Sequence, residues 1–301
     1  MIGRAYVGIS GWRYPPWRGT FYPKGLAQRR ELKYAASLLA SIEINGSFYA
    51  LQRPENYQRW YAETPEGFLF SVKGGRFITH MKKLRDVDIP LANFFASGVL
   101  ALADKLGPLL WQLPPMLGFD AERLGAFFDL LPRTTAEAAQ LALGHDERLT
   151  DRDWTTTDED RPLRHAVEIR HKSYLDPAFL TLLRERDIAI VVADTAGKWP
   201  LIETVTSNFA YIRLHGDEEL YVSGYSEAAL DRWAGLLHGW RTGATTPDGV
   251  ARDVYVYFDN DVKVHAPYNA IDLARRLDAL AAPEGLNKGA GQSPPLSAPT
   301  P

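Results

Sequence analysis

The sequence contains no cysteine. This absence excludes disulfides, thiolate nucleophiles and thiolate metal sites, and it leaves metal sites built from histidine and carboxylate side chains open. The chain also lacks any run of about 18 apolar residues, the length that a membrane-spanning helix needs. Its first residues lack the basic and apolar regions of a secretory signal. We therefore expect a cytoplasmic protein without a membrane partner.

The chain also has no excess of positively charged residues. The 301 residues include 34 Lys and Arg against 37 Asp and Glu, which gives a formal net charge of -3 at pH 7. Proteins that bind an extended polyanion usually carry a basic stripe or a net positive charge. We therefore do not expect extended nucleic acid as a partner. Neither charge nor composition favours one oligomeric state.

What the sequence does contain is a series of short segments in which apolar and other residues alternate, the pattern of half-buried strands. Hydrophobic residues make up 46% of the chain, enough for a sizeable core. The alternation predicts strands at 5–10, 41–45, 68–73, 166–170, 209–215 and 254–260. Two further strands are predicted at 109–113, which two prolines end, and at 188–194, which is almost wholly apolar as in a strand covered on both faces. Helical periodicity predicts helices at about 29–40, 54–61, 90–105, 121–131, 177–186, 230–240 and 269–280.

Three segments fall outside this pattern. Residues 197–207 show no helical periodicity, so one crossover helix is expected to be short or missing. Residues 133–162 are polar, acidic and rich in threonine, which predicts an irregular insertion with about one helical turn. The Pro, Gly and Ser-rich residues 283–301 are expected to be a disordered tail.

Eight strands that alternate with helices predict a single domain, 1–282, with the (β/α)₈ architecture of a TIM-type barrel. In most of the strands one face is apolar and the other carries polar or charged residues. An open sheet with helices on both faces would give these polar residues no place, whereas a barrel can turn them towards its lumen. The residues expected there are Ser10, Glu43, Asn45, Lys73, Gln112, Glu168, Arg170, Tyr211, Arg213, His215, Tyr257 and Asp259.

These polar residues lie late in their strands, at the carboxyl end where barrel active sites are found. A single buried Arg–Glu pair is more often structural than catalytic. A whole set of polar residues is a costly way to fill a barrel interior that Val, Ile and Leu normally occupy. We therefore expect a functional pocket.

Several sequence motifs resemble those of a known protein family. GISGWRYPPWRGTFYP, SIEINGSFY, KGGRFITH, LGPLLWQLPP, VEIRHKSY, YIRLHG and VYVYFDNDVKVHAPYNA follow one another between Gly8 and about Leu280. Together they resemble the YecE-like family, the domain of unknown function numbered seventy-two. The resemblance implies a TIM-type barrel and assigns no activity. The residues that lie in the family's characteristic motifs include Glu43, Asn45, Lys73, Gln112, Glu168, Arg170, His171, Arg213, His215 and Asn260.

The first functional hypothesis is a metal-free acid–base enzyme that acts on a small anionic sugar or nucleotide-like substrate. Arg170, Arg213 and Lys73 would bind its phosphate or carboxylate group, because arginine can donate two parallel hydrogen bonds to such a group. Glu168 or Glu43 would act with His215 as the acid–base pair. Further substrate-binding residues are expected to be Trp12, Asn45, Tyr49, His80, Gln112, Asp194, Tyr257, Asp259 and Asn260. No cofactor is expected in this hypothesis.

Three alternatives remain. Glu43, Glu168 and His215, with Asp194, are also residue types that bind a divalent metal, which would suit a metal-dependent hydrolase or isomerase. A non-catalytic barrel could bind a nucleotide or the end of a nucleic acid, with aromatic loop residues stacking on the bases. Two carboxylates also permit a glycosidase. The neighbouring cations disfavour it, because they lower the pKa of the acid that this chemistry needs.

Overall fold

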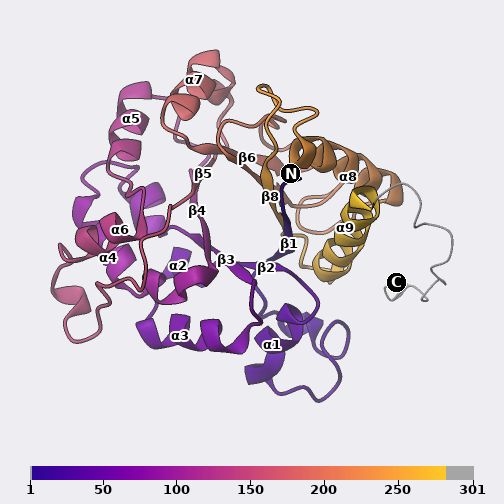
Figure 1. The fold of residues 1–301 in the computed structure, drawn as a ribbon, viewed down its shortest axis with the longest axis horizontal. Coiled ribbons are helices and arrows are strands. Elements are labelled where there is room, and N and C mark those ends of the chain that lie inside the picture. The colour runs from indigo at the N-terminus through magenta and orange to yellow at the C-terminus, as the bar shows by residue number, and fades with distance from the viewer. Residues whose placement is uncertain (1, 283–301) are drawn as a thin grey trace.

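We describe residues 2–282 of a computed structural model. Eight parallel strands pair in sequence order, β1 with β2 and onward until β8 pairs with β1, and so form a closed barrel (Figure 1). The strands are β1 (Ala5–Ser10), β2 (Ser41–Ile44), β3 (Leu69–Lys73), β4 (Leu106–Gln112), β5 (His165–Glu168), β6 (Ala189–Asp194), β7 (Phe209–Leu214) and β8 (Asp253–Phe258). The predicted (β/α)₈ architecture is confirmed.

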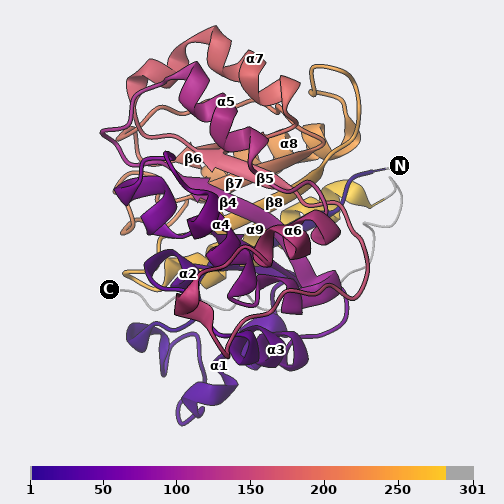
Figure 2. The ribbon, with the colours of Figure 1, turned by 90° about the vertical axis from the view of Figure 1, so that its left-hand side faces the viewer.

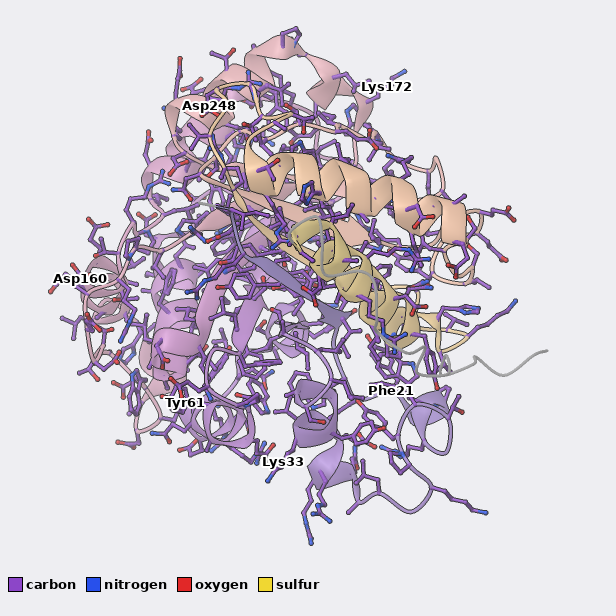
Figure 3. All side chains as sticks on the ribbon, turned by 45° about the vertical axis from the view of Figure 1, so that its right-hand side comes forward. Phe21, Lys33, Tyr61, Asp160, Lys172 and Asp248 are labelled. Carbon is purple, nitrogen blue, oxygen red and sulfur yellow. The ribbon has the colours of Figure 1, made fainter. Side chains whose placement is uncertain are left out.

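Helices surround this barrel. They are α1 (Glu31–Ala36), α2 (Gly46–Tyr49), α3 (Pro54–Glu63), α4 (Asp88–Ala96), α5 (Ala121–Asp129), α6 (Thr135–Ala142), α7 (Pro177–Glu185), α8 (Glu227–Thr242) and α9 (His265–Ala281). Figure 2 shows them from the side, with α5 and α7 together on one side of the strands. Charged side chains such as Lys33, Asp160 and Lys172 extend outward into solvent (Figure 3). No helix within residues 2–282 combines the length and the apolarity needed to cross a bilayer.

The connection from β6 to β7 contains no helix, as the sequence predicts. The helix predicted at about 90–105 is instead divided into α4 and a 3₁₀ segment, Val99–Lys105. Gly98 separates them with a φ of 108°, and a Cβ at this position would lie 2.5 Å from Cα of Pro54. The close approach of α3 therefore requires glycine here and ends the helix.

The predicted start of β4 is wrong. The strand was predicted to begin at residue 109, yet Gly107 and Pro108 lie inside β4. Phe70 pairs with Leu106 and Val72 with Leu109, so β4 has one residue more than β3 between these two pairs. This irregularity has the form of a β-bulge, and a bulge accepts a proline that cannot donate to the ladder.

The segment 133–162 is more regular than predicted. It contains the eight-residue helix α6, which Thr134 caps by accepting a hydrogen bond from the backbone N–H of Glu137 at 3.2 Å. Ala138 and Ala142 of α6 are fully buried. The missed signal is a threonine followed three residues later by glutamate, which is typical of a helix start. The predicted disordered tail, 283–301, lies outside the described residues.

The lumen contains two layers. Its amino-terminal half is mostly apolar and includes Leu69, Leu110, Ala166, Ala189, Val191, Ala193, Phe209, Tyr6, Tyr211, Tyr255 and Tyr257. The carboxyl half is charged. Tyr211 joins the two, because its ring belongs to the apolar cluster while its hydroxyl donates to Glu43 Oε2 at 2.7 Å.

Candidate functional site at the carboxyl end of the barrel

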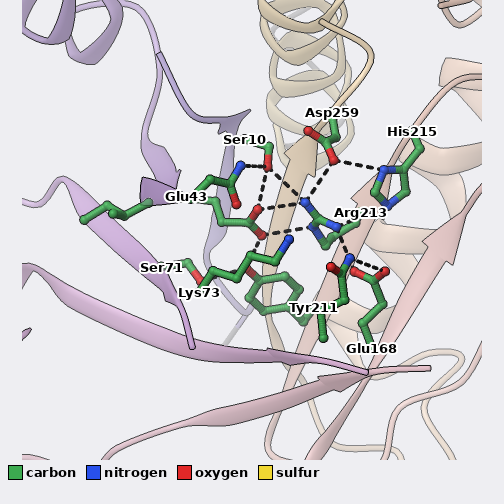
Figure 4. A network of polar contacts seen from close by, with 12 residues as sticks. Ser10, Glu43, Ser71, Lys73, Glu168, Tyr211, Arg213, His215 and Asp259 are labelled. Carbon is green, nitrogen blue, oxygen red and sulfur yellow. Dashed lines mark hydrogen bonds and ion pairs between the residues drawn. The ribbon is translucent and has the colours of Figure 1, made fainter. Parts of the chain in front are cut away.

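Arg213, on β7, stands at the centre of the charged half of the lumen (Figure 4). Its guanidinium donates from Nε and Nη2 to Glu43, from Nη1 to Glu168 and from Nη2 to Asp259, at 2.7 to 3.1 Å. These three carboxylates come from β2, from β5 and from the end of β8. Arg213 is only 1% exposed. One buried cation therefore connects three acids from across the barrel.

Glu43 is saturated with donors. Besides Arg213, it accepts hydrogen bonds from the hydroxyls of Ser10 and Tyr211, at 2.5 and 2.7 Å. Asn45 in turn donates from Nδ2 to Ser10 Oγ at 2.7 Å. The carboxylate is fully buried, so no lone pair of Glu43 faces open space.

Glu168 is equally enclosed. Its Oε1 accepts from Gln112 Nε2 at 2.8 Å and from Arg170 Nε at 2.9 Å, and its Oε2 accepts from Arg213. Burial alone would raise the pKa of Glu168, but the charges of Arg213 and Arg170 outweigh it and hold the pKa well below its usual value. A carboxyl that stays ionised at neutral pH has no proton to donate, which disfavours the predicted general-acid role.

His215 faces two members of the same network. Arg213 Nη1 lies 3.3 Å from Nε2, and because arginine can only donate, Nε2 is the acceptor. In the neutral ring the proton is then on Nδ1, which lies 3.0 Å from Asp259 Oδ2. Burial would raise the pKa of Asp259, yet Arg213 and His215 lower it to about 2. Both ring nitrogens of His215 are therefore turned towards the network rather than towards a substrate.

The ligand set expected for a divalent metal does not fit this arrangement. Glu43, Glu168 and His215 are held together by the guanidinium of Arg213, which occupies the position that a cation would need. Within the described residues, no group of three His, Asp or Glu side chains is arranged to hold a metal ion. These residues do not form a metal centre in this conformation.

A cavity of about 730 Å³ opens above the network. It is lined by residues that follow the strands at their carboxyl ends: Tyr14, Asn45, Phe48, Tyr49, Lys73, Arg76, His80, Met81, Gln112, Arg170, Arg213, Tyr221, Asp259 and Asp261. Its volume suits a small molecule. Glu43, Glu168 and His215 lie behind this lining and are fully buried.

Arg170 is held so that one edge of its guanidinium stays available. Nε donates to Glu168, and the plane of the group lies over the Trp199 ring, with Cζ 3.9 Å from the ring centroid. No described residue accepts a hydrogen bond from its Nη1 or Nη2, and the side chain lines the cavity. This geometry leaves two parallel N–H donors of one guanidinium beside the cavity, the donor pair with which arginine forms bidentate hydrogen bonds in proteins.

Three ionisable groups of the lining have displaced pKa values. Burial and the charge of Arg213 lower the pKa of Lys73 to about 8. Burial and the charges of Lys73 and Arg170 lower the pKa of His80 to about 4. Burial and the neighbouring Asp259 raise the pKa of Asp261 to about 6. Lys73 and Asp261 therefore titrate closest to neutral pH among these three.

Four of the expected substrate-binding residues lie outside the cavity lining. Asp194 accepts from the Tyr225 hydroxyl at 3.1 Å, and Asn260 donates from Nδ2 to Asn269 Oδ1 at 3.0 Å. Tyr257 is buried in the lower lumen, next to Ser41. Trp12 lines a separate, neighbouring cavity of about 280 Å³. Because side chains alternate along a strand, Asp194 turns outward where its neighbour Ala193 turns inward.

Several residues of the site were not predicted from the sequence: Arg76, Met81, Trp199, Tyr221 and Asp261. All lie on segments that follow strands, where alternation of apolar and polar residues carries no information. Their one available signal was position, since Arg76 and Asp261 each follow the end of a strand by three residues. That position corresponds to the functional end of a parallel barrel.

The fold and this charged cavity define the class: a TIM-type barrel with a candidate small-molecule site at its carboxyl end. Within that class the chain belongs to the family described as "Protein of unknown function DUF72", whose model matches residues 6–292. The resemblance deduced from the motifs is confirmed.

Named relatives agree with this assignment. The chain is 24% identical over 302 residues to the UPF0759 protein YunF of Bacillus subtilis, covering 91% of this chain and 94% of the relative. It is 31% identical to the UPF0759 protein YecE of Escherichia coli over 128 residues, which are 42% of this chain and 44% of that protein.

Solved structures of the family share the fold. A DUF72 family protein from Thermotoga maritima superposes with a TM-score of 0.70 at 23% identity, covering 91% of this chain and 99% of that one. A DUF72 family protein from Enterococcus faecalis gives a TM-score of 0.64 at 17% identity, covering 92% and 98%.

Proposed function

We propose that this protein is an enzyme that binds a small phosphate- or carboxylate-bearing substrate in the cavity at the carboxyl end of the barrel and acts on it by acid–base chemistry. The observation that carries the proposal is the state of Arg170. It is fixed by Glu168 and Trp199 along one edge and one face, while both Nη atoms remain without a partner among the described residues.

Other lining residues support an anion with an attached ring or chain. Lys73 and Arg76 add positive charge to the wall that Arg170 forms. Tyr14, Phe48 and Tyr221 give the cavity aromatic surface on which a sugar or base ring can stack. Asp259 also lines the cavity, but its negative charge is paired with Arg213.

In this proposal the proton carriers are not the ones expected from the sequence. Glu43, Glu168 and His215 are enclosed by Arg213 and its partners, so they organise the site from below. Lys73 and Asp261 face the cavity, and their pKa values of about 8 and about 6 lie on either side of neutral pH. Groups with pKa values near the working pH are the most effective proton carriers.

The experiment is calorimetric titration of the protein with inorganic phosphate and with glucose 6-phosphate against glucose. We expect Arg170→Gln to weaken binding of both phosphates by about tenfold or more, because a charge-assisted hydrogen bond contributes about 1.5–3 kcal/mol. The matched control is Arg275→Gln, which removes the same charge from the exterior of α9. Equal loss in the two variants, or none in Arg170→Gln, contradicts a specific anion site.

Salt dependence separates this proposal from binding of a nucleic-acid end. A single phosphate held by Arg170 predicts a shallow decrease of affinity with salt. A protein that contacts several phosphates of a strand loses affinity much more steeply. Tight binding of a short oligonucleotide with a steep salt slope, and no binding of glucose 6-phosphate, would favour the non-catalytic alternative.

A further inference from the structure

Two buried lysines of this barrel differ in what surrounds their amines. Lys105, which is 6% exposed, places Nζ 4.4 Å from the Tyr61 ring centroid. It also donates to the carbonyl oxygens of Tyr61 and Thr64, each at 2.7 Å, and to Thr64 Oγ1 at 3.2 Å. This is how a structural lysine is normally buried, with its donors satisfied.

Lys73 is buried to the same degree but has no such partners. It is 8% exposed, and its Nζ lies 4.4 Å from the Phe48 ring centroid. No described residue accepts a hydrogen bond from this amine, and Figure 4 shows it reaching towards the Arg213 cluster without a dashed line. Because Lys73 lines the cavity, its free donors point to the space that a ligand would fill.

The backbone holds Lys73 in this position. Its carbonyl accepts from the hydroxyl of Ser47 at 2.7 Å, and the next amide, of Gly74, donates to Leu110 O at 2.8 Å. A Cβ on residue 74 would lie 2.3 Å from the Trp111 ring, so only glycine allows the chain to pass here. The lysine is therefore presented by a fixed strand end rather than by a mobile loop.

From this geometry we infer that the amine of Lys73 is a nucleophile that forms an imine with the carbonyl group of a small anionic aldehyde or ketone. The inference rests on the proposed function, since Arg170 would bind the anionic end of the same molecule. The two cations lie near one another, because both act on His80 and Glu168 and lower the pKa of each.

The step is balanced without a redox partner. The lone pair of the neutral amine attacks the carbonyl carbon, the C–N bond forms, and the carbonyl oxygen takes a proton to give a carbinolamine. The nitrogen loses the extra proton it carries after the attack, and a second proton adds to the carbinolamine hydroxyl. The C–O bond then breaks and water leaves as the nitrogen lone pair forms the C=N bond of the protonated imine, whose N–H proton is finally released. Amine and carbonyl thus give imine and water.

The surroundings of Lys73 favour both the neutral amine that begins this step and the protonated imine that it forms. With a pKa of about 8, about one amine in ten is neutral at pH 7, against fewer than one in a thousand for an ordinary lysine. The protonated imine then restores a positive charge close to Glu43, Glu168 and Asp259, whose charges act on Lys73 in the free protein. Burial lowers the pKa of Lys105 too, so a lowered pKa does not by itself set Lys73 apart. What distinguishes Lys73 is that its amine has no hydrogen-bond acceptor among the described residues and that it lines the cavity.

The test is reductive trapping of the full-length protein with pyridoxal 5′-phosphate, an aldehyde that carries a phosphate, and with pyridoxal, the same aldehyde without it. Sodium borohydride fixes any imine, and peptide mass spectrometry locates it. We expect the phosphate-bearing probe to label Lys73 at least tenfold faster than pyridoxal does. Lys105 and the exposed Lys33 serve as internal controls. Labelling of Lys73 should reach half its maximum rate near pH 8, whereas surface lysines continue to gain above pH 10.

Failure of the inference and failure of the proposed function give different results. If Lys73 reacts no faster than Lys33 while calorimetry still detects phosphate binding, the inference is wrong and the anion site stands. If Lys73 reacts equally with both aldehydes and phosphate neither binds nor protects, the nucleophile stands and the proposed function fails. Lys73→Arg should lose the adduct at this position with an unchanged melting temperature. Arg170→Gln should keep the adduct but lose the preference for the phosphate-bearing probe.

Discussion

The two halves of the barrel lumen are filled by different kinds of side chain. The amino half is filled by apolar and aromatic side chains such as Leu110 and Val191, which need no specific partners. The carboxyl half is filled by charges that are stable only because Arg213 connects them. The first half therefore depends on volume and the second on pairing, and the second borders the cavity that Lys73 and Arg170 line.

Removal of Arg213 should break the charged half most severely. Arg213→Met leaves Glu43, Glu168 and Asp259 without their shared cation, and breaking a buried pair in this way typically costs about 3–5 kcal/mol. We expect at least this loss in the free energy of unfolding, measured with urea at pH 7. The control Arg232→Met removes the exposed partner of Glu203 and should cost about 1 kcal/mol or less. Similar losses in both variants would mean that the network contributes little.

Truncation in the apolar half should cost less and should not respond to pH. Leu110→Ala removes a fully buried side chain from the lumen, and we expect a loss of about 3 kcal/mol. Urea unfolding at pH 5 and at pH 7 should give the same difference from the parent protein, because no carboxylate of the network loses a contact. A difference that changes with pH would show that the two halves are coupled.

Acid should weaken the charged half selectively. The pKa of Asp259 is about 2 in the folded protein, below its ordinary value of 3.8, so its contribution to stability is fully present above about pH 5. That contribution is lost as the pH falls through 3.8 towards 2. A lowering from 3.8 to about 2 corresponds to about 2–3 kcal/mol. Between pH 6 and pH 2.5 the free energy of unfolding should therefore fall by about 1–2 kcal/mol less in Asp259→Asn than in the parent protein. An equal loss in the two proteins would contradict the lowered pKa.

The smallest expected effect has the opposite sign. The pKa of Lys73 is lowered to about 8, so at neutral pH the fold carries the cost of burying its charge. Lys73→Met should raise the free energy of unfolding at pH 7 by about 1–2 kcal/mol. This gain should shrink between pH 8 and pH 10.5, since the folded parent protein loses the proton there while the unfolded chain keeps it. A destabilised Lys73→Met variant would assign the amine a structural role.

Much of the fold was readable because its patterns are local. Alternation and short apolar runs placed all eight strands, and the lack of periodicity at 197–207 predicted the missing helix after β6. Errors arose where distant contacts override local signals. Pro108 lies within a strand because a bulge accommodates it, and the helix predicted at about 90–105 is interrupted at Gly98 because α3 approaches. The segment 133–162 was misjudged because its helix start at Thr134 was overlooked.

The sequence predicted which residue types meet at the candidate site, but not which of them pair with one another. The sequence indicated that acids and cations share one end of the lumen, and Glu43, Glu168, Arg170 and Arg213 do meet there. It did not indicate that Arg213 would saturate the carboxylates and leave Lys73 and Arg170 with free donors. Asp194 was assigned to the site although it turns away and accepts from Tyr225.

The sequence by itself determined the eight strands, the direction in which their side chains alternate, and the family to which the chain belongs. All of these depend on patterns within a few residues or on motifs in a fixed order. Only the tertiary structure decided which acid pairs with which cation, because β2, β5, β7 and β8 meet only when the barrel closes. The strength of a charge pair depends on distance and burial, and neither quantity exists before the chain folds.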